Sequence, residues 1–275
     1  MLTDAHCHPF DLVRVFPDAE NERRRLKVCC AASATDMEEF AYNENLARRA
    51  AVDKAAGILP CFAIHPQLPA ARANSGQRVT ENELRKELES LESLAAQGRL
   101  AAVGETGFDL YNAAFRETEA VQDMLFAAHL ETALSHELPV IIHVRRAMHK
   151  IFAAAQQLAK CKAVIFHSWP GTMGEGEALL RRGLNAYFSF GTTILLNHRE
   201  TMRCCAVFPA DRLLTETDAP FQPLRGQSFS QWTDLPRIIE AAAALRREAG
   251  SPGANTNELE NLIGVNFRTA FSHWT

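Results

Sequence analysis

Short apolar segments alternate with longer amphipathic segments along almost the whole chain, and this alternation constrains the fold more than any other feature of the sequence. The short segments are rich in valine, isoleucine and phenylalanine, which is typical of buried parallel strands. In the longer segments apolar residues recur every three or four positions, as they do on one face of a helix. The regular alternation of the two patterns predicts an α/β fold.

Eight strands are expected, and eight strands with intervening helices close most simply into a (β/α)8 TIM barrel. The strands are expected at Leu2–His6, Leu26–Ala32, Gly57–Ile64, Leu100–Gly104, Leu138–His143, Ala163–His167, Leu184–Phe190 and Arg212–Glu216. The helices are expected at about 36–52, 80–97, 115–136, 146–160, 173–183, 196–206, 232–248 and 256–272. The helix at 80–97 opens with Thr80 and Glu83 in the spacing of a capping box.

No proline- or glycine-rich linker divides the chain, so a single domain over residues 1–275 is expected. The least regular stretch, Pro220–Gln231, is expected to form a long loop after the eighth strand, beside the active face of the barrel. The seven cysteines include no Cys-x-x-Cys pair, so most of them are expected to be small buried residues in strands rather than disulfides or zinc ligands.

The overall charge is mildly acidic, with 29 basic and 33 acidic residues and a net charge of −4. Such a chain cannot attract phosphate backbones or anionic membranes through its overall field, so any nucleic-acid binding needs a local source of positive charge. No apolar run is long enough to span a membrane, and the N-terminal segment lacks the features of a signal peptide. We therefore expect a cytoplasmic protein without a membrane partner, and no obligate protein partner is evident.

Side chains that can ionise or bind metal follow the apolar runs of most strands. In an extended segment alternate residues share a face, so His6 and His8 can bind one ion together. Other strands end on His65, Glu105, His143 with Arg145, His167 and Asp218. A single histidine of this kind more often packs in a core or loop, but all strand ends of a parallel barrel meet at one face. Their coincidence predicts a metal centre there.

Imidazole and carboxylate ligands without a required thiolate suit Zn²⁺, Mn²⁺, Ni²⁺ or Co²⁺, and Mg²⁺ if water completes its coordination. The expected ligands are more numerous than a single open catalytic zinc uses, so two divalent metal ions sharing Glu105 are predicted. These ions, with Arg145 nearby, would make the site locally positive. An anionic substrate is therefore indicated.

The chain resembles the TatD family of metal-dependent deoxyribonucleases, within the amidohydrolase-like barrels. The resemblance covers nearly the whole chain and rests on Met1-Leu2-Thr3-Asp4-Ala5-His6-Cys7-His8, Ala63–Pro66, Val103–Asp109, Leu138–Arg145, Leu184–Gly191 and Arg212–Pro220. It implies that His6, His8 and Asp218 hold one metal, that His143 and His167 hold the second, and that Glu105 bridges them. His65 and Arg145 would bind the substrate phosphate.

The activity implied by the resemblance is phosphodiester hydrolysis in DNA, including 3′→5′ exonuclease action on single-stranded DNA. A water activated by two metals would attack phosphorus, with Asp218 as the proton acceptor and Glu105 as the second catalytic carboxylate. Trp169 and Pro170, which follow His167, depart from the family pattern. A further departure lies in the helix before the fifth strand, where His129 stands at a position at which glutamine is common. Trp169 and Tyr111 are candidates for stacking on a terminal base, and equally for packing of loops.

Two other hypotheses remain open on the sequence. The same barrel and ligands serve hydrolysis of small amides, lactones or phosphoesters, although those relatives often bridge their metals with a modified lysine where this chain has Glu105. The second hypothesis is a non-catalytic metal-binding or scaffold protein, and the intact ligand set argues against it. Hydrolysis of a cyclic amide, or failure to bind metal, would favour these alternatives.

Overall fold

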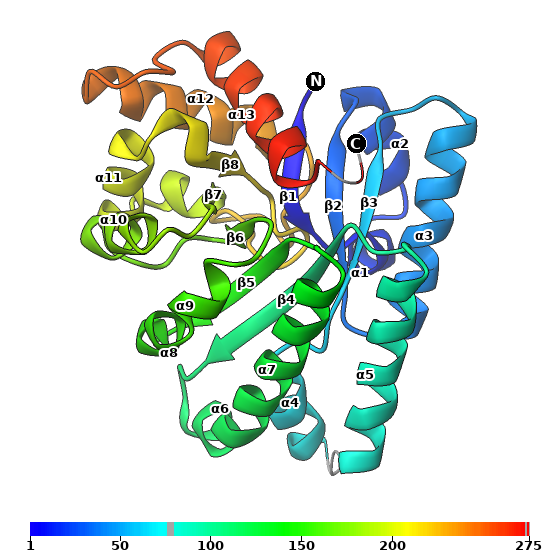
Figure 1. Ribbon diagram of the computed structural model, residues 1–275. Coiled ribbons are helices and arrows are strands. Elements are labelled where there is room, and N and C mark those ends of the chain that lie inside the picture. Colours follow the sequence, from blue (N-terminus) through cyan, green and yellow to red (C-terminus); the bar gives the residue numbers. More distant parts are fainter. Residues whose placement is uncertain (76–79, 273, 275) are drawn as a thin grey trace.

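The eight strands form one parallel sheet in the order β1-β2-β3-β4-β5-β6-β7-β8, with helices on its outside (Figure 1). The structure, a computed structural model, describes residues 1–75, 80–272 and 274. The strands are β1 (Thr3–Cys7), β2 (Cys29–Ala34), β3 (Ile58–Phe62), β4 (Ala102–Asp109), β5 (Val140–Arg145), β6 (Val164–Phe166), β7 (Ala186–Phe190) and β8 (Leu213–Thr215). Each predicted strand is therefore present, although β4 continues beyond its expected end at Gly104.

Hydrogen bonds cross the seam between β8 and β1 and bring the two edge strands together. The Asp218 amide donates to the His6 carbonyl at 3.0 Å, and the His8 amide donates to the Ala219 carbonyl at 2.8 Å. The buried Asp4 carboxylate accepts from the Thr217 hydroxyl at 2.7 Å. The predicted (β/α)8 barrel is confirmed. These contacts hold the first strand of the sheet, β1, against the segment that follows the last strand, β8.

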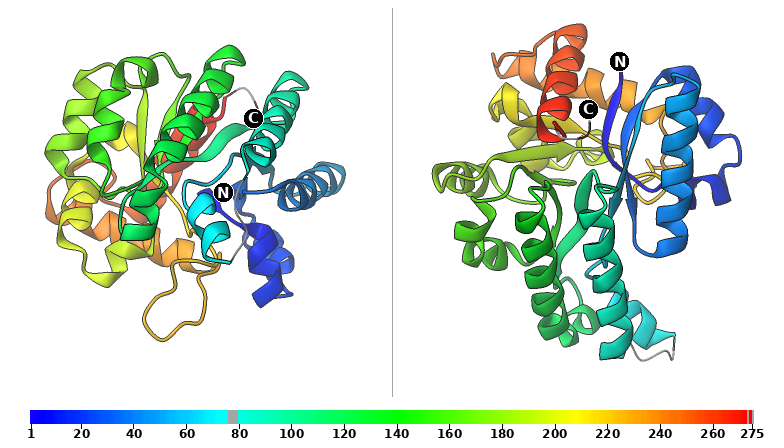
Figure 2. Two further views of the ribbon diagram at one scale, coloured as in Figure 1. Left: turned by 90° about the horizontal axis from the view of Figure 1, so that it is seen from below. Right: turned by 45° about the vertical axis from the view of Figure 1, so that its right-hand side comes forward.

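Helices connect the strands and lie around the barrel (Figures 1 and 2). They are α1 (Pro9–Val15), α2 (Ala19–Leu26), α3 (Met37–Val52), α4 (Leu68–Asn74), α5 (Glu81–Ala96), α6 (Ala113–Glu117), α7 (Glu119–Ser135), α8 (Met148–Ala153), α9 (Ala155–Leu158), α10 (Met173–Arg181), α11 (Arg199–Val207), α12 (Asp234–Glu248) and α13 (Thr256–Ala270), with 3₁₀ turns η1 (Thr192–Leu196) and η2 (Ala210–Arg212). The short helices α1, α2 and α4 were not predicted, and the expected helices at 115–136 and 146–160 are each divided.

The interior of the barrel is apolar except at the end that carries the site. Side chains of every strand are buried there, and all seven cysteines are free and buried, as predicted. Strands β4 and β5 lie so close that a Cβ at Gly107 would collide with the His143 carbonyl oxygen. Gly107 also has φ +134°, a conformation that favours glycine. This glycine therefore lets Glu105 and His143 sit on tightly packed neighbouring strands.

The segment between β8 and α12 contains no helix or strand and extends from the barrel as a loop (Figure 2). The expected loop at Pro220–Gln231 is thus confirmed. At the N-terminus of α5, Thr80 and Glu83 form the predicted capping box, in which the side chain of each accepts from the backbone amide of the other. Within the described part of the chain, no helix is long and apolar enough to cross a membrane.

Candidate metal centre

Residues that are far apart in the sequence meet at the carboxyl ends of the strands. Their nitrogen and oxygen atoms form three overlapping groups, in each of which the atoms lie within 4.8 Å of one another. The groups are His6 with Glu105 and His167, His6 with His8 and Asp218, and His65 with Glu105 and His143. Every residue that the sequence predicted as a metal ligand therefore lies in this cluster, and His65 lies in it as well.

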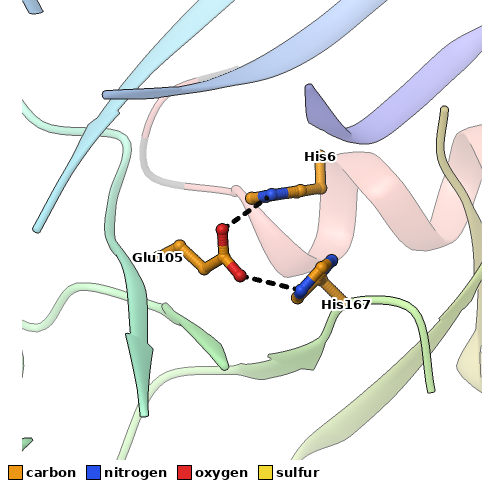
Figure 3. A group of neighbouring side chains, drawn as sticks. All are labelled: His6, Glu105 and His167. Carbon is orange, nitrogen blue, oxygen red and sulfur yellow. Dashed lines mark ion pairs between the residues drawn. The ribbon is translucent and has the colours of Figure 1, made fainter. Parts of the chain in front are cut away.

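Glu105 occupies the middle of the cluster (Figure 3). Its Oε2 lies 3.1 Å from His6 Nε2, and its Oε1 lies 2.8 Å from His167 Nε2. The same Oε1 lies 2.6 Å from Nδ1 of His143. One carboxylate oxygen thus faces the β1 side of the cluster while the other faces the β5 and β6 side, which is the arrangement that a bridging carboxylate requires.

The outward-facing nitrogens of the central histidines have polar neighbours of their own. His6 Nδ1 lies 3.1 Å from the Ser33 hydroxyl, and His143 Nε2 lies 3.2 Å from Asp109 Oδ2. Asp109 can accept a proton from the outward nitrogen of His143, and the Ser33 hydroxyl can either donate to or accept from that of His6. Each of these histidines therefore has a second polar partner that helps to fix the orientation of its ring.

Inward nitrogens also face each other in the cluster, which tests whether a cation fits. His6 Nε2 is 3.1 Å from His8 Nε2, and His143 Nδ1 is 3.2 Å from His167 Nε2. Two lone pairs at such distances repel unless a proton or a cation lies between them. Nitrogen and carboxylate donors in this number suit a borderline divalent ion, so the residues present fit a metal.

The buried carboxylates favour positive charge in the cluster. Burial lowers the pKa of His167, but Glu105 and Glu216 outweigh burial and raise it well above its ordinary value. Burial raises the pKa of Glu105, yet the surrounding histidines, His167 foremost, hold it well below its usual range. Glu105 is therefore ionised at neutral pH, and a divalent cation would supply the positive charge that the histidine protons otherwise provide.

The cluster lies in a cavity of about 830 Å³ that has both polar and apolar lining residues. The polar ones include His65 and Arg145, and the apolar ones include Leu196, Phe221 and Pro223. Phe221 is 57% exposed, and its ring edge approaches His8 at 5.0 Å between centroids. The cavity can therefore take a ligand that has both anionic and apolar or aromatic groups.

The two aromatic residues predicted as stacking candidates have different environments. Trp169 is only 1% exposed and packs against Phe166, Phe188 and Phe208, so its role is loop and core packing. Tyr111 is 46% exposed and lies beside Arg145. The aromatic side chain exposed at the cavity is instead Phe221, which sequence reasoning did not single out.

Sequence reasoning also missed the residues that position the predicted ligands. Asp109 faces His143, Ser33 faces His6, and Glu216 Oε1 lies 3.4 Å from His167 Nδ1. Gln222 donates to Asp218 Oδ2 at 2.8 Å from the loop after β8. Asp109 and Glu216 stand in the motifs that carried the family resemblance, and their acidic character next to a ligand strand was the available signal.

Comparison with known proteins decides the family. The family profile described as TatD related DNase matches residues 3–272. The chain belongs to the TatD family. The resemblance identified from the sequence is confirmed, and as a TatD-family member the chain is a metal-dependent hydrolase.

Individual proteins resemble this chain in sequence and in fold. A protein of Erwinia tasmaniensis named 3'-5' ssDNA/RNA exonuclease TatD is 32% identical over 190 residues, which cover 66% of this chain and 70% of that protein. A Buchnera aphidicola protein named as an uncharacterized metal-dependent hydrolase is 27% identical over 244 residues. The aligned region covers 82% of this chain and 81% of that protein. The crystal structure of YJJV, a TatD homolog from Escherichia coli, superposes with a TM-score of 0.78 at 24% identity, covering 98% of both chains, and supports the fold.

Proposed function

We propose that this chain is a metal-dependent phosphodiesterase that removes nucleotides from the 3′ end of single-stranded DNA, as a single unit spanning residues 1–275. The observation that carries the proposal is the position of Glu105, between inward-facing histidine nitrogens at the base of a cavity that Arg145 also lines. The relatives named as 3'-5' ssDNA/RNA exonucleases support the substrate class. RNA is the closest alternative substrate.

We assign the ligands to two divalent ions, as the family resemblance implies. His6, His8 and Asp218, whose ligand atoms form one group, would hold one ion. His143 and His167, whose nitrogens lie 3.2 Å apart, would hold the other, and Glu105 would bridge them. When bound, such ions lower the pKa of water and neutralise charge on the phosphate. Ser33 and Asp109 would orient the rings of His6 and His143 toward the ions.

Asp218 is positioned to accept the proton of the attacking water. Its Oδ1 lies 3.5 Å from both His6 Nε2 and His8 Nε2, while Gln222 holds its Oδ2. Burial raises the pKa of this carboxyl, but His8 and His6 outweigh burial and lower it below its ordinary value. Asp218 is therefore in its basic form at neutral pH, as a general base must be.

His65 and Arg145 line the cavity and are the proposed phosphate-binding residues. His65 Nε2 lies 3.3 Å from Glu105 Oε1, so its ring borders the proposed second ion. Burial lowers the pKa of His65, which therefore presents a neutral ring at neutral pH. Arg145 then supplies the permanent positive charge for non-bridging phosphate oxygens.

The test compares Asp218→Asn with the wild-type protein after loading with Zn²⁺, Mn²⁺, Mg²⁺, Ni²⁺ or Co²⁺. Wild type should shorten a 5′-labelled single-stranded oligonucleotide in steps and release the label of a 3′-labelled one first. Asp218→Asn should lose at least about 100-fold in turnover. Asp211→Asn, an exposed aspartate in η2 at the start of β8, is the matched control and should keep full activity.

The outcome depends on metal content, which is measured on the same samples. Full activity of Asp218→Asn with metal retained would remove Asp218 from the mechanism. Hydrolysis of a cyclic amide or lactone by wild type, with no cleavage of any oligonucleotide, would replace the nuclease proposal by the amidohydrolase alternative.

A further inference from the structure

Two arginines and a tyrosine form a stack at the ends of β4 and β5, at the edge of the cavity. The guanidinium carbon of Arg145 lies 4.2 Å from the centre of the Tyr111 ring, and that of Arg146 lies 4.6 Å from it. Both distances are those of cation–π contacts. Arg145 belongs to the cavity wall, whereas Arg146 lies outside it, so this Arg145–Tyr111–Arg146 stack leads away from the metal centre.

The backbone holds the stack in place although its side chains are exposed. The Leu110 amide donates to the Arg145 carbonyl at 2.9 Å, and the Tyr111 amide donates to Asp109 Oδ1 at 2.8 Å. Arg146 Nη1 in turn donates to the Tyr111 carbonyl at 3.4 Å. The ring therefore orders two long side chains that would otherwise sample many rotamers, and a ligand would not have to order them on binding.

The stack also keeps its positive charge. In the part of the chain that the structure describes, no carboxylate lies within 4.0 Å of the Arg146 guanidinium. The carboxylate next to Arg145 is Asp109, at 3.6 Å, which also pairs with His143 and accepts from Gln67. Guanidinium groups stacked on a ring keep their N–H edges for planar acceptors such as phosphate.

We propose that Arg146, ordered by Tyr111, binds the phosphate next along a single strand from the one at the metal centre. The inference rests on the proposed function, because Arg145 is assigned there to the phosphate that is cleaved. Arg146 is the ordered cation next to Arg145, and it directly follows Arg145 at the end of β5. The ligand is therefore a strand with at least two phosphates, not a mononucleotide ester.

The experiment measures the effect of Arg146→Ala on substrates of different length. Its KM for a single-stranded oligonucleotide should rise about fivefold, and the slope of log Kd against log salt should become about 0.7 smaller. Its kcat and KM for a dinucleoside monophosphate and for bis(p-nitrophenyl) phosphate, which have no second phosphate, should not change. Arg146→Lys should restore most of the salt slope but only part of the KM, because lysine keeps the charge and loses the planar fork.

The matched control is Arg48→Ala, which removes an exposed arginine from α3 far from the cavity and should leave all of these values unchanged. Arg146 has φ +53°, which strains alanine and arginine alike, so the substitution adds no backbone cost. Thermal unfolding checks the fold of each variant, and Arg146→Gln replaces any variant that is destabilised. Tyr111→Leu, which releases both Arg145 and Arg146, should weaken oligonucleotide binding and should also raise the KM for the short substrates.

The outcomes separate this inference from the proposed function. An unchanged oligonucleotide KM in Arg146→Ala would overturn the inference while leaving the nuclease intact. An equal loss on the dinucleoside monophosphate would place Arg146 at the cleaved phosphate instead. Failure of wild type to hydrolyse any phosphodiester would overturn the proposed function. Fluorescence anisotropy of a labelled oligonucleotide with metal-free protein then tests Arg146 independently of turnover, with the same difference expected.

Discussion

At the scale of single residues, Phe221 offers the sharpest test of how a strand is held. Its ring is exposed at the cavity beside His8, and its amide donates to the Asp218 carbonyl at 2.7 Å. Stacking of a base on an aromatic ring contributes about 1–3 kcal/mol. We expect Phe221→Ala to raise the KM for a single-stranded oligonucleotide about tenfold, with little change in thermal stability.

The control for Phe221 lies in the substrate as well as in the protein. An oligonucleotide whose 3′-terminal nucleotide lacks its base should be cleaved equally well by wild type and Phe221→Ala. Phe221→Tyr keeps the ring and should behave as wild type on both substrates. Equal losses on the normal and the abasic oligonucleotide would mean that Phe221 supports the fold of the loop rather than a base.

Sequence reasoning succeeded for residues whose direction is set by a strand and failed where a loop decides it. His6 and Glu105 could be placed because the ends of parallel strands share one face of a barrel. The direction of Trp169 could not be predicted, because Ser168 before it has φ +43° and the chain turns the indole into the core. Gln222 was missed because its contact with Asp218 depends on how a long loop folds back.

At the scale of elements, His129 joins α7 to β4 and to the segment that follows β3. Its Nε2 accepts from the Ile64 amide at 3.3 Å, so its Nδ1 carries the proton and donates to the Thr106 hydroxyl at 2.7 Å. Burial lowers the pKa of His129 from 6.5 to about 3. Between these values the unfolded chain binds a proton that the folded chain does not, so stability falls as pH falls from about 6.5.

We therefore expect His129→Gln to remove one component of acid sensitivity. Glutamine can accept from Ile64 and donate to Thr106 without titrating. Between pH 7 and pH 5, wild type should lose about 2 kcal/mol of unfolding free energy that the variant does not lose. Urea unfolding of both metal-free proteins at the two pH values measures the difference. Burial raises the pKa of Asp4 to about 7, so this carboxyl makes the folded state more stable as pH falls, but by the same amount in both proteins. Identical pH slopes would contradict the assignment.

The elements that sequence periodicity missed are those that depend on tertiary contacts. Each strand was predicted because its apolar run is buried on both faces, which leaves a strong local pattern. Helix α2, with the sequence AENERRRL, has almost no apolar face, and its Arg23 is instead buried by hydrogen bonds to the Val28 and Ala56 carbonyls. Strand β4 extends past Gly104 because Gly107 permits close pairing with β5.

At the scale of the whole molecule, the candidate ligands connect the first strand of the barrel to the last. His6 lies in β1, Glu105 and His143 lie on strands in the middle of the sheet, and Asp218 lies in the segment after β8. An ion held by these residues binds the folded barrel and not the unfolded chain. Metal binding should therefore stabilise the entire fold rather than a local loop.

We expect saturating divalent metal to raise the melting temperature of the metal-free protein. At a metal concentration about 100 times the Kd, the gain is about 2.7 kcal/mol, or roughly 5 °C for a chain of this size. Glu105→Gln should remove most of the shift because the central carboxylate is lost. Glu22→Gln, a buried glutamate on α2 outside the cavity, is the matched control and should keep the full shift. A shift of equal size in Glu105→Gln would show that the ion binds elsewhere, and chelation followed by reloading distinguishes the metal effect from irreversible unfolding.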